Sequence, residues 1–282
     1  MRVDSPTFVR FQLGAQLRRL REAIKVPTER AAAVIKVSPS TLRRIETGRV
    51  GIKGPALNAL LTAYGVDNTE LRETLLTMAR EGKRRGWWAK YGDLPEVYRQ
   101  YIGLESAADE MLNFETIVVP GLLQTEAYAH AMTSEDAFDP GPEAIAQRVD
   151  ARMERQKLIS QGTLQLVAVM DEAVLHRQIG GPQVMRDQLA ALLQAAALRN
   201  VTLQVIPFRD GAYASMLSSF AILNFPHGPG VVYIEGLTGD LYAEGEDLRR
   251  CLTVFTNLRS SAMSPSASLE MIQQIRDAEH QP

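Results

Sequence analysis

Cysteine is almost absent from this sequence, since Cys251 is the only one among 282 residues. A single cysteine excludes an intramolecular disulfide, and because no partner motif surrounds it we expect a small buried side chain and not a reactive thiol. No apolar run approaches the roughly 18 residues that a membrane-spanning helix needs. The first residues also lack the apolar stretch of a secretory signal. These absences predict a cytoplasmic protein without a membrane partner.

The motifs of common catalytic and metal sites are missing as well. The four histidines are scattered along the chain, at His130, His176, His227 and His280. No second histidine completes a His-Glu-x-x-His zinc motif, and neither a Gly-x-Ser-x-Gly turn nor a phosphate-binding glycine loop occurs. Glu172 precedes His176 by four residues, a spacing that favours a capping and surface pair. The sequence therefore predicts no enzymatic activity, no metal and no cofactor.

The net charge of −2 conceals a strong asymmetry along the chain. Residues 1–90 hold 18 basic and 8 acidic side chains, whereas the remaining residues hold 13 basic and 25 acidic ones. A basic N-terminal third favours contact with a polyanion such as DNA. The charge pattern is also compatible with two oppositely charged surfaces that attract each other.

The first 85 residues carry helical patterns. Leucines at 13, 17 and 20 recur at the spacing of one helix face, and four further short helices are predicted at 28–35, from 38, after 54–55 and from 67. Five short helices with short connections indicate an all-α domain over residues 1–86.

A mixed pattern follows Gly86. Strands are predicted at 163–170, 201–208, 220–225 and 231–234, and helices at 95–115, 143–160, 182–198, 246–259 and 267–279. We therefore expect an α+β protein, in which a mixed α/β domain over residues 87–282 follows the all-α domain. The stretch 134–142 is predicted to be an exposed loop.

The helix predicted after Ser38 has the residue pattern of a DNA-recognition helix. Ser38 is a good N-cap and Pro39 suits the first helical position. At about 100° per residue, one face of this helix presents Ser40, Arg43, Arg44 and Thr47. Arginines can read guanine edges and hydroxyls can bond bases or phosphates, so this face suits the major groove. A generic amphipathic helix with a solvated basic face is the alternative.

Residues 12–65 resemble the XRE family of helix-turn-helix regulators, which are related to the phage repressors. The resemblance is carried by LGAQLRRLREA (13–23), VPTERAAAVIKVSPSTLRRIETG (26–48) and ALNALLTAYGV (56–66). It implies a lambda-repressor-like fold in which residues 38–47 form the recognition helix. The alanines at 31–33 suit the close helix crossing of this motif. The chain departs from the family at Pro27-Thr28, where Thr-Gln is common, and at Lys36, where the turn prefers glycine.

The resemblance also implies roles for individual residues. Pro39, Ser40 and Arg44 are expected to approach base edges, Thr28 to reach a phosphate, and Arg43, Arg49 and Lys53 to touch the DNA backbone. Ser38, Thr41 and Thr47 complete the predicted DNA-binding set. Arg21 and Glu46 are expected to form a structural ion pair.

Residues 87–282 resemble the domain of unknown function that follows such modules in actinobacterial, WhiJ-like regulators. The matching strings are LESAADEMLNFETIVVPGLLQTEAYA (104–129), RMERQKLI (152–159), MDEAVLHRQIGG (170–181), VMRDQLAALLQAAALRNVTLQVIPF (184–208) and VVYIEG (231–236). The resemblance implies a regulator of differentiation or specialised metabolism that is encoded beside a small BldB-like companion protein.

Three features of this second part allow two interpretations each. Residues 120–125 read as a turn that enters a helix at Thr125 and buries two leucines, or as part of a ligand site. Trp87 and Trp88 can pack where two domains join or line a pocket. Gly180-Gly181-Pro182 is more simply a turn before a helix than a catalytic element.

Three functions remain open on these grounds. The first is a dimeric, sequence-specific repressor that binds an operator in double-stranded DNA and is associated with the nucleoid. The second is a sensor whose α/β domain holds a small-molecule effector in a cavity. The third is an antitoxin-like protein that binds a small companion and regulates its own gene.

Overall fold

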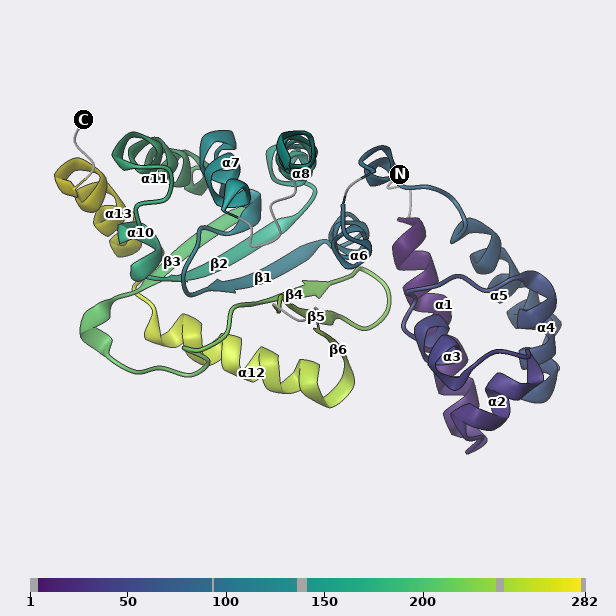
Figure 1. Ribbon diagram of the computed structural model, residues 1–282. Coiled ribbons are helices and arrows are strands. Elements are labelled where there is room, and N and C mark those ends of the chain that lie inside the picture. Colours follow the sequence, from purple (N-terminus) through teal and green to yellow (C-terminus); the bar gives the residue numbers. More distant parts are fainter. Residues whose placement is uncertain (1–4, 93, 136–140, 237–240, 280–282) are drawn as a thin grey trace. The chain divides into compact units, whose positions relative to one another are not determined.

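A computed structural model describes residues 5–92, 94–135, 141–236 and 241–279. The chain forms two compact units (Figure 1). The first comprises Met1–Lys90 and Tyr98–Ala107, and the second comprises Tyr91–Val97 and Ala108–Pro282. The division after residue 86 stays a prediction, but the first unit also contains a later segment, which the sequence did not indicate.

The first unit contains the five predicted helices. They are α1 (Pro6–Ala23), α2 (Thr28–Val34), α3 (Pro39–Glu46), α4 (Gly54–Ala63) and α5 (Thr69–Glu81). A 3₁₀ turn, η1 (Trp87–Lys90), and part of α6 (Glu96–Glu105) follow. The core of the five helices is built from leucines at helical spacing, and five of them have no exposed surface: Leu17, Leu42, Leu57, Leu60 and Leu61. The all-α character predicted for this part is confirmed.

The second unit is built on a six-stranded mixed sheet with the strand order β3-β2-β1-β4-β5-β6. The strands are β1 (Glu110–Glu115), β2 (Gln165–Asp171), β3 (Val201–Ile206), β4 (Phe220–Asn224), β5 (Val231–Ile234) and β6 (Leu241–Ala243). Strands β1, β2 and β3 run parallel, while β4, β5 and β6 pair antiparallel. The predicted α+β fold class, with a mixed α/β C-terminal part, is confirmed.

One predicted helix is wrong in its second half. The pattern at 95–115 was expected to be a single helix, but α6 ends at Glu105 and residues 110–115 form the central strand β1. Met111, Leu112, Asn113 and Phe114 are buried in succession, because neighbouring elements cover both faces of this strand. A strand buried on both faces loses the alternating pattern that distinguishes it from a helix.

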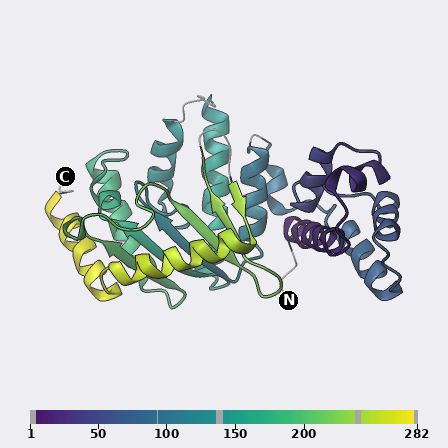
Figure 2. The ribbon, with the colours of Figure 1, turned by 90° about the horizontal axis from the view of Figure 1, so that it is seen from below.

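Helices cover both faces of the sheet (Figures 1 and 2). Helix α12 (Gly245–Ser261) crosses one face, and α7 (Glu126–Ser134), α8 (Gly141–Arg155) and α11 (Pro182–Ala196) lie on the other. The shorter elements are η2 (Gly121–Leu123), α9 (Lys157–Ser160), α10 (Ala173–His176) and η3 (Phe208–Asp210). Under α12, the core contains Phe114, Val169, Ile222, Phe255 and Leu258.

The free edge of β3 is covered by the segment before α13 (Pro265–Glu279) and by the first turn of that helix. The backbone N–H of Met263 donates to the carbonyl oxygen of Val205 at 2.9 Å. The hydroxyl of Ser268 accepts a hydrogen bond from the N–H of Val205 at 3.0 Å. Because an uncovered edge strand invites pairing with other chains, these contacts protect this side of the sheet.

Several local predictions can be placed in the second unit. Thr125 is the N-cap of α7 and its hydroxyl accepts from the N–H of Tyr128, as expected for a turn that enters a helix. Leu122 and Leu123 are buried, and α11 begins directly after Gly181. Of the predicted loop 134–142, residues 136–140 lie outside the described residues.

Two other predictions need correction in detail. Cys251 is half-buried and not fully buried, and burial raises the pKa of its thiol. The Glu172 carboxylate does contact His176 Nε2 at 3.3 Å, but it also accepts a hydrogen bond of 2.7 Å from the backbone N–H of Phe208. This pair is therefore part of the fold at the end of β3 and is more than a surface contact.

Candidate nucleic-acid interface

Helix α3 begins with a cluster of hydroxyl groups. Ser38 is the N-cap, and its Oγ accepts a hydrogen bond of 3.1 Å from the N–H of Thr41. The same Oγ lies 2.8 Å from Ser40 Oγ and 2.9 Å from Thr41 Oγ1. Pro39 occupies the first helical position, as the sequence predicted. The cap thus fixes the start of α3 and holds three hydroxyls in a group that can bond a base or a phosphate.

The two sides of α3 differ as the sequence predicted. Leu42 and Ile45 are buried in the core of the first unit. Ser40, Arg43 and Arg44 are exposed on the other side. This arrangement places hydroxyl and guanidinium groups along one exposed face of the helix, and readout in the major groove requires groups of this kind.

On that face, Arg43 contacts α2, and the Thr47 hydroxyl contacts the helix backbone. Arg43 Nη2 lies 3.5 Å from Glu29 Oε1 on α2, and both side chains are more than 60% exposed. An exposed pair of this kind contributes less than about 1 kcal/mol, so a phosphate can replace Glu29 at low cost. Thr47 is half-buried, and its hydroxyl donates to the carbonyl oxygen of Arg43 at 2.9 Å. Toward DNA, Thr47 Oγ1 is therefore left as an acceptor.

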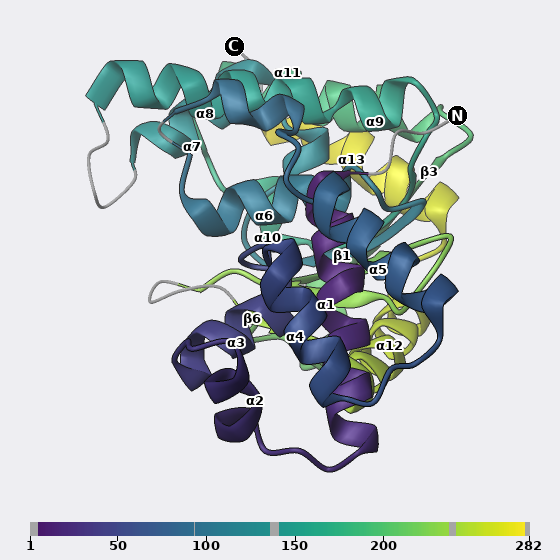
Figure 3. The same cartoon turned by 90° about the vertical axis from the view of Figure 1, so that its right-hand side faces the viewer.

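The turn between α2 and α3 has the geometry that the sequence predicted. Lys36 has a φ of 54°, in the left-handed region that favours glycine. Ala31 and Ala32 are buried at the crossing of α2 and α3, which lie side by side in Figure 3. Ala33 is exposed, so only the first two alanines allow the close approach of the helices.

The other predicted contacts lie around α3. Thr28 is the first residue of α2 and is half-buried. Arg49 is exposed just after α3, and Lys53 is exposed at the N-cap of α4. Their contacts with DNA stay predictions.

Arg21 and Glu46 form a buried, bidentate ion pair. Arg21 Nε donates to Glu46 Oε1 at 2.6 Å, and Nη2 donates to Oε2 at 2.8 Å. Arg21 Nη1 also donates to the carbonyl oxygen of Val26 at 3.1 Å. The hydrogen bond with Glu46 holds the pKa of Arg21 above its ordinary value, and burial raises the pKa of the nearby Tyr64 to about 12. The pair ties the end of α3 to α1 and to the loop before α2.

Sequence reasoning missed a second set of contacts at the end of α3. Arg10 on α1 donates from Nη1 to the carbonyl oxygen of Gly82 at 2.7 Å and from Nε to that of Gly48 at 3.5 Å. The amide nitrogen of Gln100, on α6, donates to the carbonyl oxygen of Thr47 at 3.4 Å. Gln100 lies 53 residues from Thr47, so no local pattern could have indicated this contact.

Gly14 within α1 and Gly48 just after α3 allow these two helices to approach closely. A Cβ on Gly14 would lie 2.5 Å from the carbonyl oxygen of Ile45. A Cβ on Gly48 would lie 2.5 Å from the Cα of Phe11, and Gly48 also has a φ of 69°. No larger residue fits at either position without moving α1 or α3.

Comparisons with known protein families agree with this geometry. Residues 12–75 match a helix-turn-helix domain. Residues 98–274, more than half of the chain, match the family described as Domain of unknown function (DUF5753). The chain belongs to the DUF5753 family. No curated protein and no solved structure matches it.

The helix-turn-helix match confirms the resemblance of the N-terminal part to XRE-like modules and indicates a DNA-binding regulator. The DUF5753 match confirms that a second family domain follows, and it begins at Tyr98, inside α6. No helix among the described residues is long and apolar enough to cross a membrane. Within the same residues, no group of three or more His, Cys, Asp or Glu side chains is placed to hold a metal ion.

Proposed function

We propose that this DUF5753 protein is a sequence-specific transcription repressor that binds operator DNA as a dimer and is not an enzyme. The observation that carries the proposal is the exposed face of α3, with Ser40 and Arg44 on a helix whose opposite side is buried. In this proposal Pro39, Ser40 and Arg44 approach base edges. Phosphates are bound by Arg43, Arg49, Lys53 and Thr28. These phosphate contacts fix the register of the protein on the duplex.

Substitution of Arg44 tests the proposed base contact. Arg44→Ala should cost about 1–3 kcal/mol in operator binding and relax the preference at one base pair, because a bidentate contact with guanine is lost. Genome-wide recovery of fragments bound by the purified full chain supplies the operator, and fluorescence anisotropy measures its affinity. Arg80→Ala on α5 is the matched control, since Arg80 is exposed in the same unit but lies outside α2 and α3. Equal weakening on all DNA sequences would show that Arg44 binds a phosphate.

The proposed dimer is supported by the short DNA segment that one recognition helix can read. One helix-turn-helix unit reads only a half-site, and dimers bind two half-sites about 34 Å apart. We therefore expect the recovered operator to be palindromic with this spacing and binding to fall steeply with salt. A single, non-repeated site bound by one copy of the chain would contradict the dimer.

We further propose that the acidic second unit controls DNA binding, either with a small companion protein or with a small molecule. The family resemblance of the sequence supports the companion and the antitoxin-like role, and co-purification with the product of a neighbouring gene tests them. A pocket between α12 and the sheet of the second unit supports the small molecule.

A further inference from the structure

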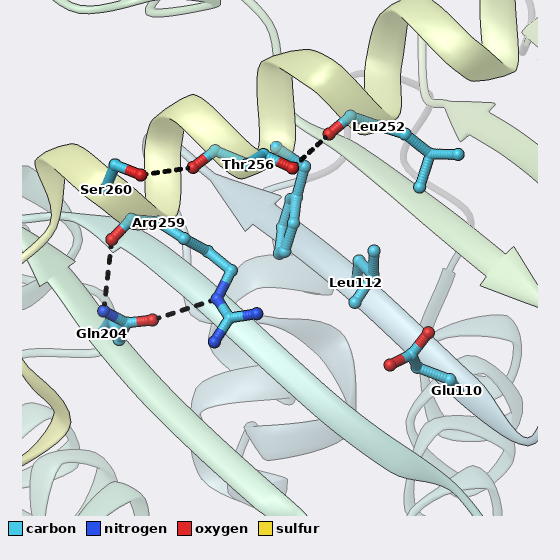
Figure 4. A pocket seen from close by; sticks show the side chains of 8 residues that line it. Glu110, Leu112, Gln204, Leu252, Thr256, Arg259 and Ser260 are labelled. Atoms are coloured by element: carbon cyan, nitrogen blue, oxygen red, sulfur yellow. Dashed lines mark hydrogen bonds between the residues drawn. The ribbon is translucent and has the colours of Figure 1, made fainter.

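A pocket of about 400 Å³ lies between helix α12 and the sheet of the second unit (Figure 4). Its lining combines three apolar side chains with five polar ones: Leu112, Leu252 and Phe255, and Glu110, Gln204, Thr256, Arg259 and Ser260. Sites for small molecules have volumes of about 300–1,000 Å³, so the pocket is large enough for a ligand of modest size.

One end of the pocket holds an arginine that is fixed in place. Gln204 is buried, and its amide nitrogen donates to the carbonyl oxygen of Met263 at 2.9 Å and to that of Arg259 at 3.4 Å. Its amide oxygen accepts from Arg259 Nε at 3.4 Å. Both N–H donors of the Gln204 amide are thus engaged, and its oxygen orients the guanidinium of Arg259.

The remaining donors of Arg259 are available. Within the described part of the chain, neither Nη1 nor Nη2 of Arg259 makes a hydrogen bond or an ion pair. Figure 4 shows Nε as the guanidinium nitrogen that is joined to the Gln204 amide. A guanidinium held at Nε with two open Nη groups can bind a carboxylate through two parallel hydrogen bonds.

The other end of the pocket carries the opposite charge. Glu110, the first residue of β1, accepts a hydrogen bond of 2.7 Å from Asn224 Nδ2 through its Oε2. Its Oε1 has no donor among the described residues. The Glu110 carboxylate is thus held by one oxygen, and the second oxygen can receive an ammonium group.

The strand register gives the separation of the two ends. Glu110 pairs with Gln165 on β2, and Gln204 pairs with Val169 on the same strand. This offset of four residues and two strand spacings places the backbones of Glu110 and Gln204 about 16 Å apart. Their side chains and that of Arg259 reach into this interval, so the two charges bracket a gap that an elongated molecule can span.

The middle of the pocket has no charge. Leu112 lies between the two ends in Figure 4, and Leu252 and Phe255 line the pocket from α12. The hydroxyls of Thr256 and Ser260 donate to backbone carbonyl oxygens of α12 at 2.9 and 3.0 Å. They present only acceptor lone pairs, and the section between the two charges suits an aliphatic body.

We propose that this pocket binds an elongated amphoteric small molecule, with an amine at Glu110, a carboxylate at Arg259 and an aliphatic segment between them. The negative charge of Glu110 at one end of the pocket balances the positive charge of Arg259 at the other. This arrangement favours a ligand with one positive and one negative group over simple anions and simple cations. This proposal does not depend on DNA binding and can fail or succeed separately from it.

A series of straight-chain ω-amino carboxylates tests the proposal. The full chain is titrated with ω-aminobutanoate, ω-aminohexanoate, ω-aminooctanoate and ω-aminododecanoate by isothermal calorimetry. We expect affinity to pass through a maximum at an intermediate length that spans the two charges. Octylamine and octanoate, which each lack one charge, should bind about tenfold more weakly than ω-aminooctanoate, since one charged hydrogen-bonded contact is lost. Equal binding of these three molecules, or no binding at any length, would overturn the proposal.

Variants locate the site. Glu110→Gln keeps an acceptor for Asn224 but removes the charge, and Arg259→Met removes the guanidinium, so each should weaken the best ligand about tenfold. Arg259→Lys keeps the charge without the fork and should lie between Arg259→Met and the wild type. Arg250→Met is the control, because Arg250 is on the same helix but pairs with Glu246 outside the pocket. Thermal unfolding verifies that each variant is folded, and equal losses for Arg250→Met and Arg259→Met would refute the assignment.

Discussion

Replacing Arg21 with methionine would leave the carboxylate of Glu46 buried without its partner. The Glu46 side chain is only 4% exposed, and Arg21 binds both of its oxygens. Removing one member of a buried pair costs about 3–5 kcal/mol, so we expect the free energy of unfolding of the first unit to fall by that amount. For a unit of 60–100 residues each kcal/mol corresponds to roughly 4–8 °C, which predicts a melting temperature lower by at least about 12 °C.

Tryptophan fluorescence can follow this unit selectively. Both tryptophans of the chain, Trp87 and Trp88, belong to the first unit, and Trp88 is buried. Urea unfolding of the full chain, monitored by their emission, therefore gives the stability of the DNA-binding unit within the intact protein. Operator affinity should fall together with stability, because the pair holds the end of the recognition helix.

A matched pair on the same helix provides the control. On α1, Arg18 Nε lies 2.9 Å from Glu22 Oε1, and the two side chains are 50% and 52% exposed. Breaking this pair with Arg18→Met should cost less than about 1 kcal/mol, since exposed pairs contribute little. A double variant, Arg21→Met with Glu46→Leu, should recover most of the stability lost in either single variant, because no buried charge then remains. Equal costs for Arg18→Met and Arg21→Met, or strictly additive costs in the double variant, would refute this account.

Two further predictions concern packing and pH. Gly103→Ala would place a Cβ 2.5 Å from the side chain of Thr7, so we expect the free energy of unfolding, measured by tryptophan fluorescence, to fall by about 1–3 kcal/mol. Gly54→Ala is the control and should change it little, because the space around Gly54 is open. Equal effects of the two substitutions would contradict the close contact. Burial raises the pKa of Glu115 from 4.5 to about 7, helped by repulsion from Glu235. The stability that the protonated Glu115 contributes is fully present below pH 4.5 and is lost as the pH rises through about 7. The free energy of unfolding of the second unit, followed by circular dichroism, should therefore decline over this pH range, and Glu115→Gln should remove the decline.

Local sequence signals explain which parts of the helix-turn-helix could be predicted. The start of α3 depends on Ser38 and Pro39, which act within one turn, and the inward face depends on Leu42 and Ile45 at helical spacing. The left-handed turn at Lys36 could be expected because the family prefers glycine there. These are short-range effects of the backbone and of periodicity, so a single sequence is sufficient to recognise them.

Long-range packing explains what could not be predicted. Strand β1 resembles a helix in sequence because it is buried on both faces, and β6 has only three residues. The pocket joins Glu110 to Arg259 across 149 positions of the chain, and only the strand order brings them to one site. Neither residue belongs to a recognisable motif, so the sequence contained no signal for the site.

Helix α6 shows why the two family domains do not correspond to two separable parts. The DUF5753 match begins at Tyr98, yet residues 98–107 belong to the compact unit that contains α3. Within that unit, Gln100 bonds the carbonyl oxygen that follows α3, and Gly103 lies against α1. A fragment that ends at residue 86 therefore lacks part of the packing that supports the reader. Because β1 begins at Glu110, five residues after α6 ends, the DUF5753 sheet is joined directly to a helix on which the DNA-binding unit depends.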